Sequence, residues 1–254
     1  MWLEARMSRM VVEYWEALPY EQEPFPRDLA RSASLALPVA IHEISYLSLA
    51  VVRQWLRDRG VADVIRGPDR RLRGCLLAYG GHGFVLIDSS DADDERRFTL
   101  AHEIAHFLLD YREPRREAID ALGDEIIAVL DGERPPTQTE RLHAILSSVP
   151  VGLHLNLMER TIAGGYVSRA TGAAEERADR LAFELLAPAA HVWTAISPFM
   201  KSGTAYPDLV RRFVDVLQEQ YGLPHTQAQE YARWLLKHGG HKPGVREWLG
   251  IAER

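Results

Sequence analysis

The spacing of apolar residues divides the chain into a mixed first half and a helical second half. In the first half, apolar residues recur every three to four positions over 2–18, 27–36 and 48–59, the spacing of one helix face. Shorter apolar runs bounded by turn residues indicate strands, and they lie at 37–44, 72–79 and 84–88. The glycine-rich joint between the last two runs predicts a β-hairpin, and Pro38 favours an edge position for the first run.

The second half is mostly helical in pattern, with an ambiguous stretch around 150–158, a glycine-rich stretch at 162–169 and a last helical turn expected at 245–249. Stretches of helix length lie at 118–130, 139–146, 173–186, 208–221 and 225–238. The expected fold class is therefore α+β, with a small mixed β-sheet packed on one central helix and a mostly helical C-terminal half. The expected parts are an N-terminal helical segment at 1–36, a sheet-containing domain at 37–190 with a helical insert at 112–160, and a C-terminal helical, helix-turn-helix-like subdomain at 191–254.

The central helix is expected to begin near Asp93 and to run to about Tyr111. It is apolar on nearly all sides, yet it carries two histidines and a glutamate. His102-Glu103-Ile-Ala-His106 matches the pattern H-E-x-x-H. Residues four apart share one helix face, so His102 and His106 can bind one metal ion, with Glu103 placed to hold a water beside it. Burying these side chains is costly unless they are paired, and a divalent cation is the simplest partner. Because the pattern defines only three positions, a third ligand is needed to support it.

The helix at 173–186 offers that third ligand. Hydrolytic zinc sites usually have three protein ligands, and Glu175 and Asp179 lie four residues apart on one face of this helix. One of these carboxylates could bind the ion, and the other could hold the outer ring nitrogen of a ligand histidine. Glu176, offset by about 100° around the helix, is a rival ligand. A solvated acidic face is the alternative interpretation, but the apolar residues beside it indicate a packed helix. His143, His154 and His191 are further competing ligands.

Composition narrows the class of protein. The 254 residues are 46% hydrophobic and 26% charged with a net charge of −6, which is ordinary for a soluble protein and offers no basic surface for nucleic acid. Cys75 is the single cysteine, so no intrachain disulfide can form, which suits a reducing cytosol. No apolar run has the length of a signal peptide or a membrane span. We therefore expect a cytoplasmic protein without direct binding to membrane or nucleic acid.

Two blocks of this sequence resemble the ImmA/IrrE family of metallo-endopeptidases. The first is RFTLAHEIAHFLL at 97–109, and the second is EERADRLAFELLAP at 175–188. Ala187 stands where the family usually has methionine before Pro188. The segment between the blocks is longer than expected for compact members, so the insert at 112–160 is expected to be a lid or a specificity element.

The resemblance implies a cytoplasmic zinc endopeptidase of the gluzincin type. By position, His102, His106 and Glu175 would bind one zinc ion, Glu103 would be the general base, and Asp179 would orient a ligand histidine. The family also implies a protein substrate, a helix-turn-helix repressor that is cleaved in a stress or mobile-element response. Zinc is the expected ion, although the ligand set also suits other divalent metals such as manganese.

Two points stay open at this stage. Tyr166 and His154 are candidate oxyanion donors, because both lie in the stretch that leads to Glu175. The alternative function is a non-catalytic, zinc-containing regulatory protein that binds a transcription factor without cutting it. The intact Glu103 argues against this alternative, since a purely structural metal site has no use for a base beside the ion.

Overall fold

The computed structural model describes residues 4–19, 24–61, 65–141, 149–159, 169–200 and 204–241. The strands in this part are β1 (Val39–Ile44), β2 (Leu72–Tyr79), β3 (His82–Asp88) and β4 (His154–Glu159). The helices are α1 (Ala5–Glu16), α2 (Leu29–Ala36), α3 (Leu49–Arg57), α4 (Asp93–His106), α5 (Glu113–Leu122), α6 (Ile127–Leu130), α8 (Arg169–Leu186), α9 (Ala189–Ile196), α10 (Tyr206–Glu219) and α11 (His225–His238). The α+β class with a helical C-terminal half is confirmed.

The four strands form one mixed sheet in the order β1-β3-β2-β4. β1 runs parallel to β3, while β2 is antiparallel to both of its neighbours. The predicted hairpin joins β2 to β3 through Gly80 and Gly81, which both have positive φ, the conformation that two-residue hairpin turns require. β1 lies at an edge, as Pro38 indicated, and β4 forms the other edge.

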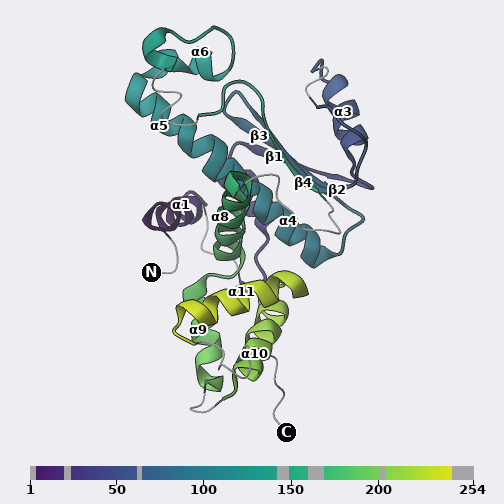
Figure 1. The fold of residues 1–254 in the computed structure, drawn as a ribbon, viewed down its shortest axis with the longest axis vertical. Coiled ribbons are helices and arrows are strands. Elements are labelled where there is room, and N and C mark those ends of the chain that lie inside the picture. Colours follow the sequence, from purple (N-terminus) through teal and green to yellow (C-terminus); the bar gives the residue numbers. More distant parts are fainter. Residues whose placement is uncertain are drawn as a thin grey trace.

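Alternate side chains of the sheet enter two different cores. Leu76, Ala78, Val85 and Ile87 pack with the apolar side chains of α4 and α8. Cys75, Leu77 and Leu86 point to the opposite face, where they pack on Leu49, Val52 and Leu56 of α3. The sheet is thus covered by α4 on one face and by α3 on the other, and α9–α11 lie at the far end of the molecule (Figure 1). Cys75 is fully buried among these apolar side chains.

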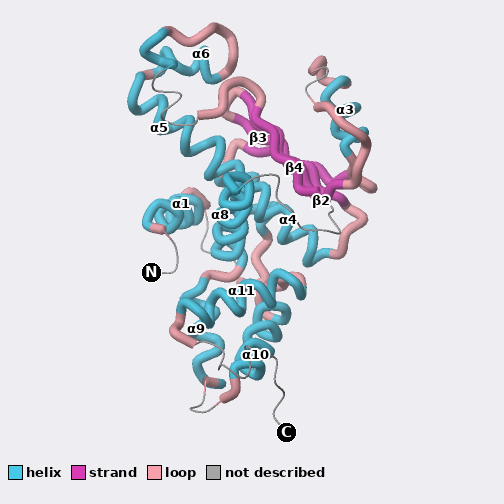
Figure 2. The backbone as a smooth tube through the Cα atoms, viewed as in Figure 1, coloured by secondary structure: helices cyan, strands magenta, loops and turns pink. Residues whose placement is uncertain are grey.

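The helical path that begins with α4 continues beyond the end predicted from the apolar pattern. The expected end lay near Tyr111, but a π-helical segment η1 (Phe107–Arg112) follows α4 directly and leads into α5. Figure 2 shows α4 and α5 as one long rod beside the sheet. Helix α8 packs across α4 and begins at Arg169, earlier than expected.

The segment at 112–160 differs from the expected helical insert. Its last part is the edge strand β4, which pairs antiparallel with β2; the sequence analysis left this stretch ambiguous, although Leu153, Leu155 and Leu157 alternate along it and pack on the core. The helix expected from Thr139 is capped two residues earlier, since the Thr137 hydroxyl accepts the Glu140 N–H at 3.3 Å. The rest of that helix, the glycine-rich stretch before Arg169 and the expected turn at 245–249 lie outside the described residues. Helix α9 was not predicted.

Asp88 ends β3 and organises the loop that leads into α4. Its carboxylate is fully buried and accepts hydrogen bonds from Tyr46 N at 2.9 Å, Ser90 Oγ at 2.6 Å and Arg71 Nη2 at 2.9 Å. Burial alone would raise the pKa of Asp88, but the bonds from Ser90, Arg71 and Tyr46 together lower this pKa to about 2.

Asp88→Asn is expected to lower the free energy of unfolding by about 2 kcal/mol at neutral pH. A depressed folded-state pKa stabilises the fold above the unfolded-state pKa of about 4, and this contribution disappears as the pH falls toward about 2. Urea unfolding of both proteins across this range measures the difference, with the exposed Asp120→Asn as the control. A difference that does not change with pH would exclude the carboxylate charge as its source.

Within the described residues, no helix combines the length and the apolar character that crossing a lipid bilayer requires.

Candidate metal centre

The motif side chains of α4 are completely enclosed by the fold. His102 and His106 are each 2% exposed, and Glu103 is 0% exposed. Strand β2 approaches α4 closely at Gly74, where an added Cβ would lie 2.6 Å from Thr99 Cγ2 and 2.9 Å from Glu103 Oε1. Glycine at position 74 therefore lets the sheet pack directly on the glutamate.

The two histidines and Glu175 converge on one point between α4 and α8. His102 Nε2 and His106 Nε2 lie 3.1 Å apart. Glu175 Oε2 is 3.2 Å from His102 Nε2, and Glu175 Oε1 is 3.6 Å from His106 Nε2. One possible ligand atom from each of the three residues lies within 4.8 Å of the others. The packing of α8 across α4 thus brings together residues that are far apart in the sequence.

A carboxylate holds the outer nitrogen of each histidine. Asp179 Oδ1 is 2.8 Å from His102 Nδ1, and Asp110 Oδ2 is 2.6 Å from His106 Nδ1. Both imidazoles therefore present Nε2 to the same point, an arrangement typical of metal-ligating histidines. Asp179 was named from the sequence, but Asp110 was not. The missed signal was its spacing, four residues after His106 on the same helix face.

Glu103 lies beside the histidines but does not share their ion pairs. Its Oε2 accepts a bond from Asn156 Nδ2 at 3.4 Å, while its Oε1 is buried and has no partner among the described residues. Burial raises the pKa of Glu103, and the nearby histidines oppose this rise. Asn156 was missed because it belongs to β4, a strand that the sequence analysis did not assign.

The surroundings of the cluster favour the positively charged form of both histidines and the negatively charged form of Glu175. Burial would lower the pKa of His102, but its bonds to Asp179 and Glu175 raise the pKa to about 10. The pKa of His106 is also raised by Asp110 and Glu175 against the effect of burial. Burial would raise the pKa of Glu175, but the two histidines lower it to about 2.

These features fit a divalent cation. The carboxylates of Glu103, Asp110, Glu175 and Asp179 surround the two imidazoles, so the buried site is rich in negative charge when the histidines are neutral. Two imidazole nitrogens and one carboxylate oxygen form a common ligand set for zinc, and they suit several other divalent ions. The cluster is therefore compatible with a bound metal ion.

The other candidate residues lie outside this cluster. The Glu176 side chain is 64% exposed and pairs with Arg180 of the same helix, so the structure places Glu175 and not Glu176 against the histidines. His154 begins β4, where its ring stacks on Tyr111 with 6.1 Å between ring centroids. His191 contacts Phe25. Tyr166 and His143 lie outside the described residues.

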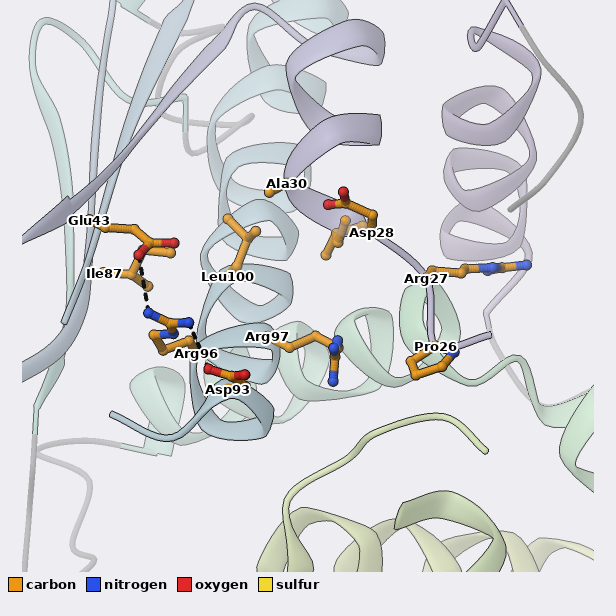
Figure 3. A pocket seen from close by; sticks show the side chains of 11 residues that line it. Pro26, Arg27, Asp28, Ala30, Glu43, Ile87, Asp93, Arg96, Arg97 and Leu100 are labelled. Atoms are coloured by element: carbon orange, nitrogen blue, oxygen red, sulfur yellow. Dashed lines mark hydrogen bonds and ion pairs between the residues drawn. The ribbon is translucent and has the colours of Figure 1, made fainter. Parts of the chain in front are cut away.

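A separate cavity of about 380 Å³ lies where α2, α4 and the ends of β1 and β3 meet, and none of the three clustered residues lines it (Figure 3). Its charged side chains already have protein partners. Arg96 pairs with Glu43 at 3.1 Å and with Asp93 at 2.7 Å, and Arg97 donates to the Gly222 carbonyl at 3.2 Å. These contacts connect the start of α4 to β1 and to the segment around Gly222, so the charged residues of the cavity stabilise the fold.

Comparison with known proteins links the segment that contains helix α4 to a peptidase family. Residues 66–129 match the family model of the IrrE N-terminal-like domain. The matched segment contains His102, Glu103 and His106 and ends before Glu175. Neither the curated proteins nor the solved structures gave a significant match. The match supports the family resemblance over 66–129, which includes the first sequence block at 97–109, while the second block at 175–188 lies beyond it.

Proposed function

We propose that the protein is a cytoplasmic, zinc-dependent endopeptidase that cleaves a helix-turn-helix transcriptional repressor. The convergence of His102, His106 and Glu175 on one point, with Glu103 buried beside it, is the observation that carries the peptidase proposal. The choice of a repressor as substrate rests on the family resemblance. The single, buried Cys75 supports a reducing compartment.

In this proposal, His102, His106 and Glu175 hold the ion, and Asp179 orients His102. A bound zinc ion supplies Lewis-acid chemistry, since it polarises the scissile carbonyl and makes water more acidic. Glu103 accepts the proton of the attacking water and delivers it to the leaving amine. The raised pKa of Glu103 brings this carboxylate closer to the range in which a group both accepts and donates protons near neutral pH.

Asn156 supports Glu103 from the neighbouring strand. Its amide N–H donates to Glu103 Oε2, a contact that holds this carboxylate in place beside the histidines. His154 lies on the same side of β4 as Asn156, two residues earlier, because alternate residues of a strand share one face. We keep His154 and Tyr166 as proposed oxyanion donors. Among the described strands β4 lies at an edge of the sheet, where an extended substrate could add as a further strand.

The test of this function is proteolysis of a purified helix-turn-helix repressor in the presence and absence of a metal chelator. We expect cleavage by the purified protein, loss of cleavage with the chelator, and recovery when zinc is added back. Binding of the repressor without any cleavage under these conditions would favour the non-catalytic regulatory alternative. Cleavage that the chelator does not reduce would contradict a metal-dependent mechanism.

A further inference from the structure

We infer that Asp110 is a positioning residue for the metal centre, which fixes the ring of His106 as Asp179 fixes the ring of His102. The inference rests on the proposed function and extends it to a residue that neither sequence block of the family resemblance includes. Asp110 would not touch the ion or the substrate. Its role would be to keep the proton of His106 on Nδ1 and the lone pair of Nε2 directed at the ion.

The geometry of the two histidine–carboxylate pairs is closely matched. The distance from His106 Nδ1 to Asp110 Oδ2 is 2.6 Å, against 2.8 Å from His102 Nδ1 to Asp179 Oδ1. The Asp110 side chain is 24% exposed, and the Asp179 side chain is 22% exposed. Because the two carboxylates are equally shielded from water and equally close to their imidazoles, they should affect the two ligands to a similar extent.

The two carboxylates come from different elements, and this explains how Asp110 reaches His106. Asp179 lies on α8 and crosses to α4, whereas Asp110 lies in η1, one turn beyond His106 on the same helical rod. Helical side chains lean toward the N-terminus, so the Asp110 carboxylate points back over the His106 ring. The π-helical turn begins directly after His106, and such turns are frequent at functional sites.

A second contact links Asp110 to the helix of the third ligand. Arg177 Nη2 lies 3.8 Å from Asp110 Oδ1, the oxygen that does not bind His106. Arg177 follows Glu175 by two residues on α8. The pair is half exposed on the arginine side, so its energy is small. Its effect is directional, because it favours the carboxylate orientation in which Oδ2 faces the imidazole.

The test compares the metal affinities of the full-length parent, Asp110→Ala, Asp110→Asn and Asp179→Ala. Affinity is measured by competition with a chelator of known strength, with cobalt(II) as a spectroscopic probe of the ligand geometry. We expect Asp110→Ala to weaken metal binding by roughly 10–100-fold and Asp179→Ala by a similar factor. Asp110→Asn keeps the shape and one acceptor oxygen, so its loss should be smaller. Asp120→Ala removes an exposed carboxylate from α5 and should leave the affinity unchanged.

Thermal unfolding of the metal-free proteins separates positioning from simple structural support. If Asp110→Ala lowers the unfolding temperature but binds the metal as tightly as the parent, Asp110 is only structural and the inference is wrong. Should Asp110→Ala fail to fold, Asp110→Asn decides the matter, since an unchanged affinity and cobalt spectrum would overturn the inference. If the parent itself binds no divalent metal, the proposed function fails first, and the inference fails with it.

Discussion

Glu103→Gln is expected to abolish peptide hydrolysis while the metal content of the protein stays at the parent level. Glutamine has the size of glutamate but cannot accept the water proton near neutral pH. A positioned general base contributes about 10²–10⁴-fold, so we expect kcat/KM to fall by at least ~100-fold, which corresponds to about 2.7 kcal/mol of transition-state stabilisation. Cleavage of a repressor substrate and metal analysis of the same sample measure the two quantities together.

The fold should tolerate this change. Glu103 Oε1 has no hydrogen-bond partner among the described residues, and Oε2 only accepts a bond from Asn156, which a glutamine oxygen can also accept. Glu184→Gln is the matched control, because it removes another, partly buried α-helical carboxylate whose pKa is raised to about 7 by burial. Proteolysis at the parent rate in Glu103→Gln would exclude Glu103 as the base. Loss of the metal from this variant would show that Glu103 supports ion binding itself.

Glu175→Gln is expected to remove most of the metal affinity, whereas Glu176→Gln should leave it unchanged. The Glu175 carboxylate lies 3.2 Å from His102 Nε2, and an amide oxygen without charge is a much weaker ligand than a carboxylate. The loss should exceed the ~10–100-fold that removal of an outer hydrogen-bond partner causes. The Glu176 side chain is 64% exposed and pairs with Arg180, so its charge lies in solvent.

Both variants carry the same charge change on the same helix, which makes them a matched pair. Chelator competition gives the two affinities, and circular dichroism checks that α8 remains folded. A loss of affinity in Glu176→Gln with none in Glu175→Gln would reverse the assignment of the third ligand. Equal and small effects in both would mean that the ion, if bound, takes its third ligand elsewhere.

The local elements of this protein follow well from its sequence. The buried character of α4 and the spacing of His102 and His106 depend on helix periodicity, which acts over one or two turns. The β2–β3 hairpin depends on a two-glycine turn between adjacent strands. The helices at 208–221 and 225–238 were also found, at nearly the observed bounds of α10 and α11. In each case the deciding interactions are between residues close in the sequence.

Partners from distant elements required the tertiary structure. Strand β4 forms by pairing with the edge of β2. The alternation of Leu153, Leu155 and Leu157 was not assigned to a strand, and Asn156 was missed with it. The choice between Glu175 and Glu176 depends on how α8 is rotated against α4, since the two side chains differ by about 100° around the helix. Gly74 was also missed, because the space that a Cβ would need is taken by Thr99 and Glu103 of another element.

Some residues of the candidate metal centre could be identified from the sequence, and the roles of others required the tertiary structure. The sequence determined His102, Glu103 and His106, because helix geometry alone sets their relative positions. It also named Glu175 and Asp179 as candidates through their spacing. Only the packing of α8 on α4 decided that Glu175 faces the histidines and that Asp179 holds His102. The physical reason is that periodicity specifies which face of a helix a residue occupies. Side-chain packing between helices then specifies which residues of the neighbouring helix this face contacts.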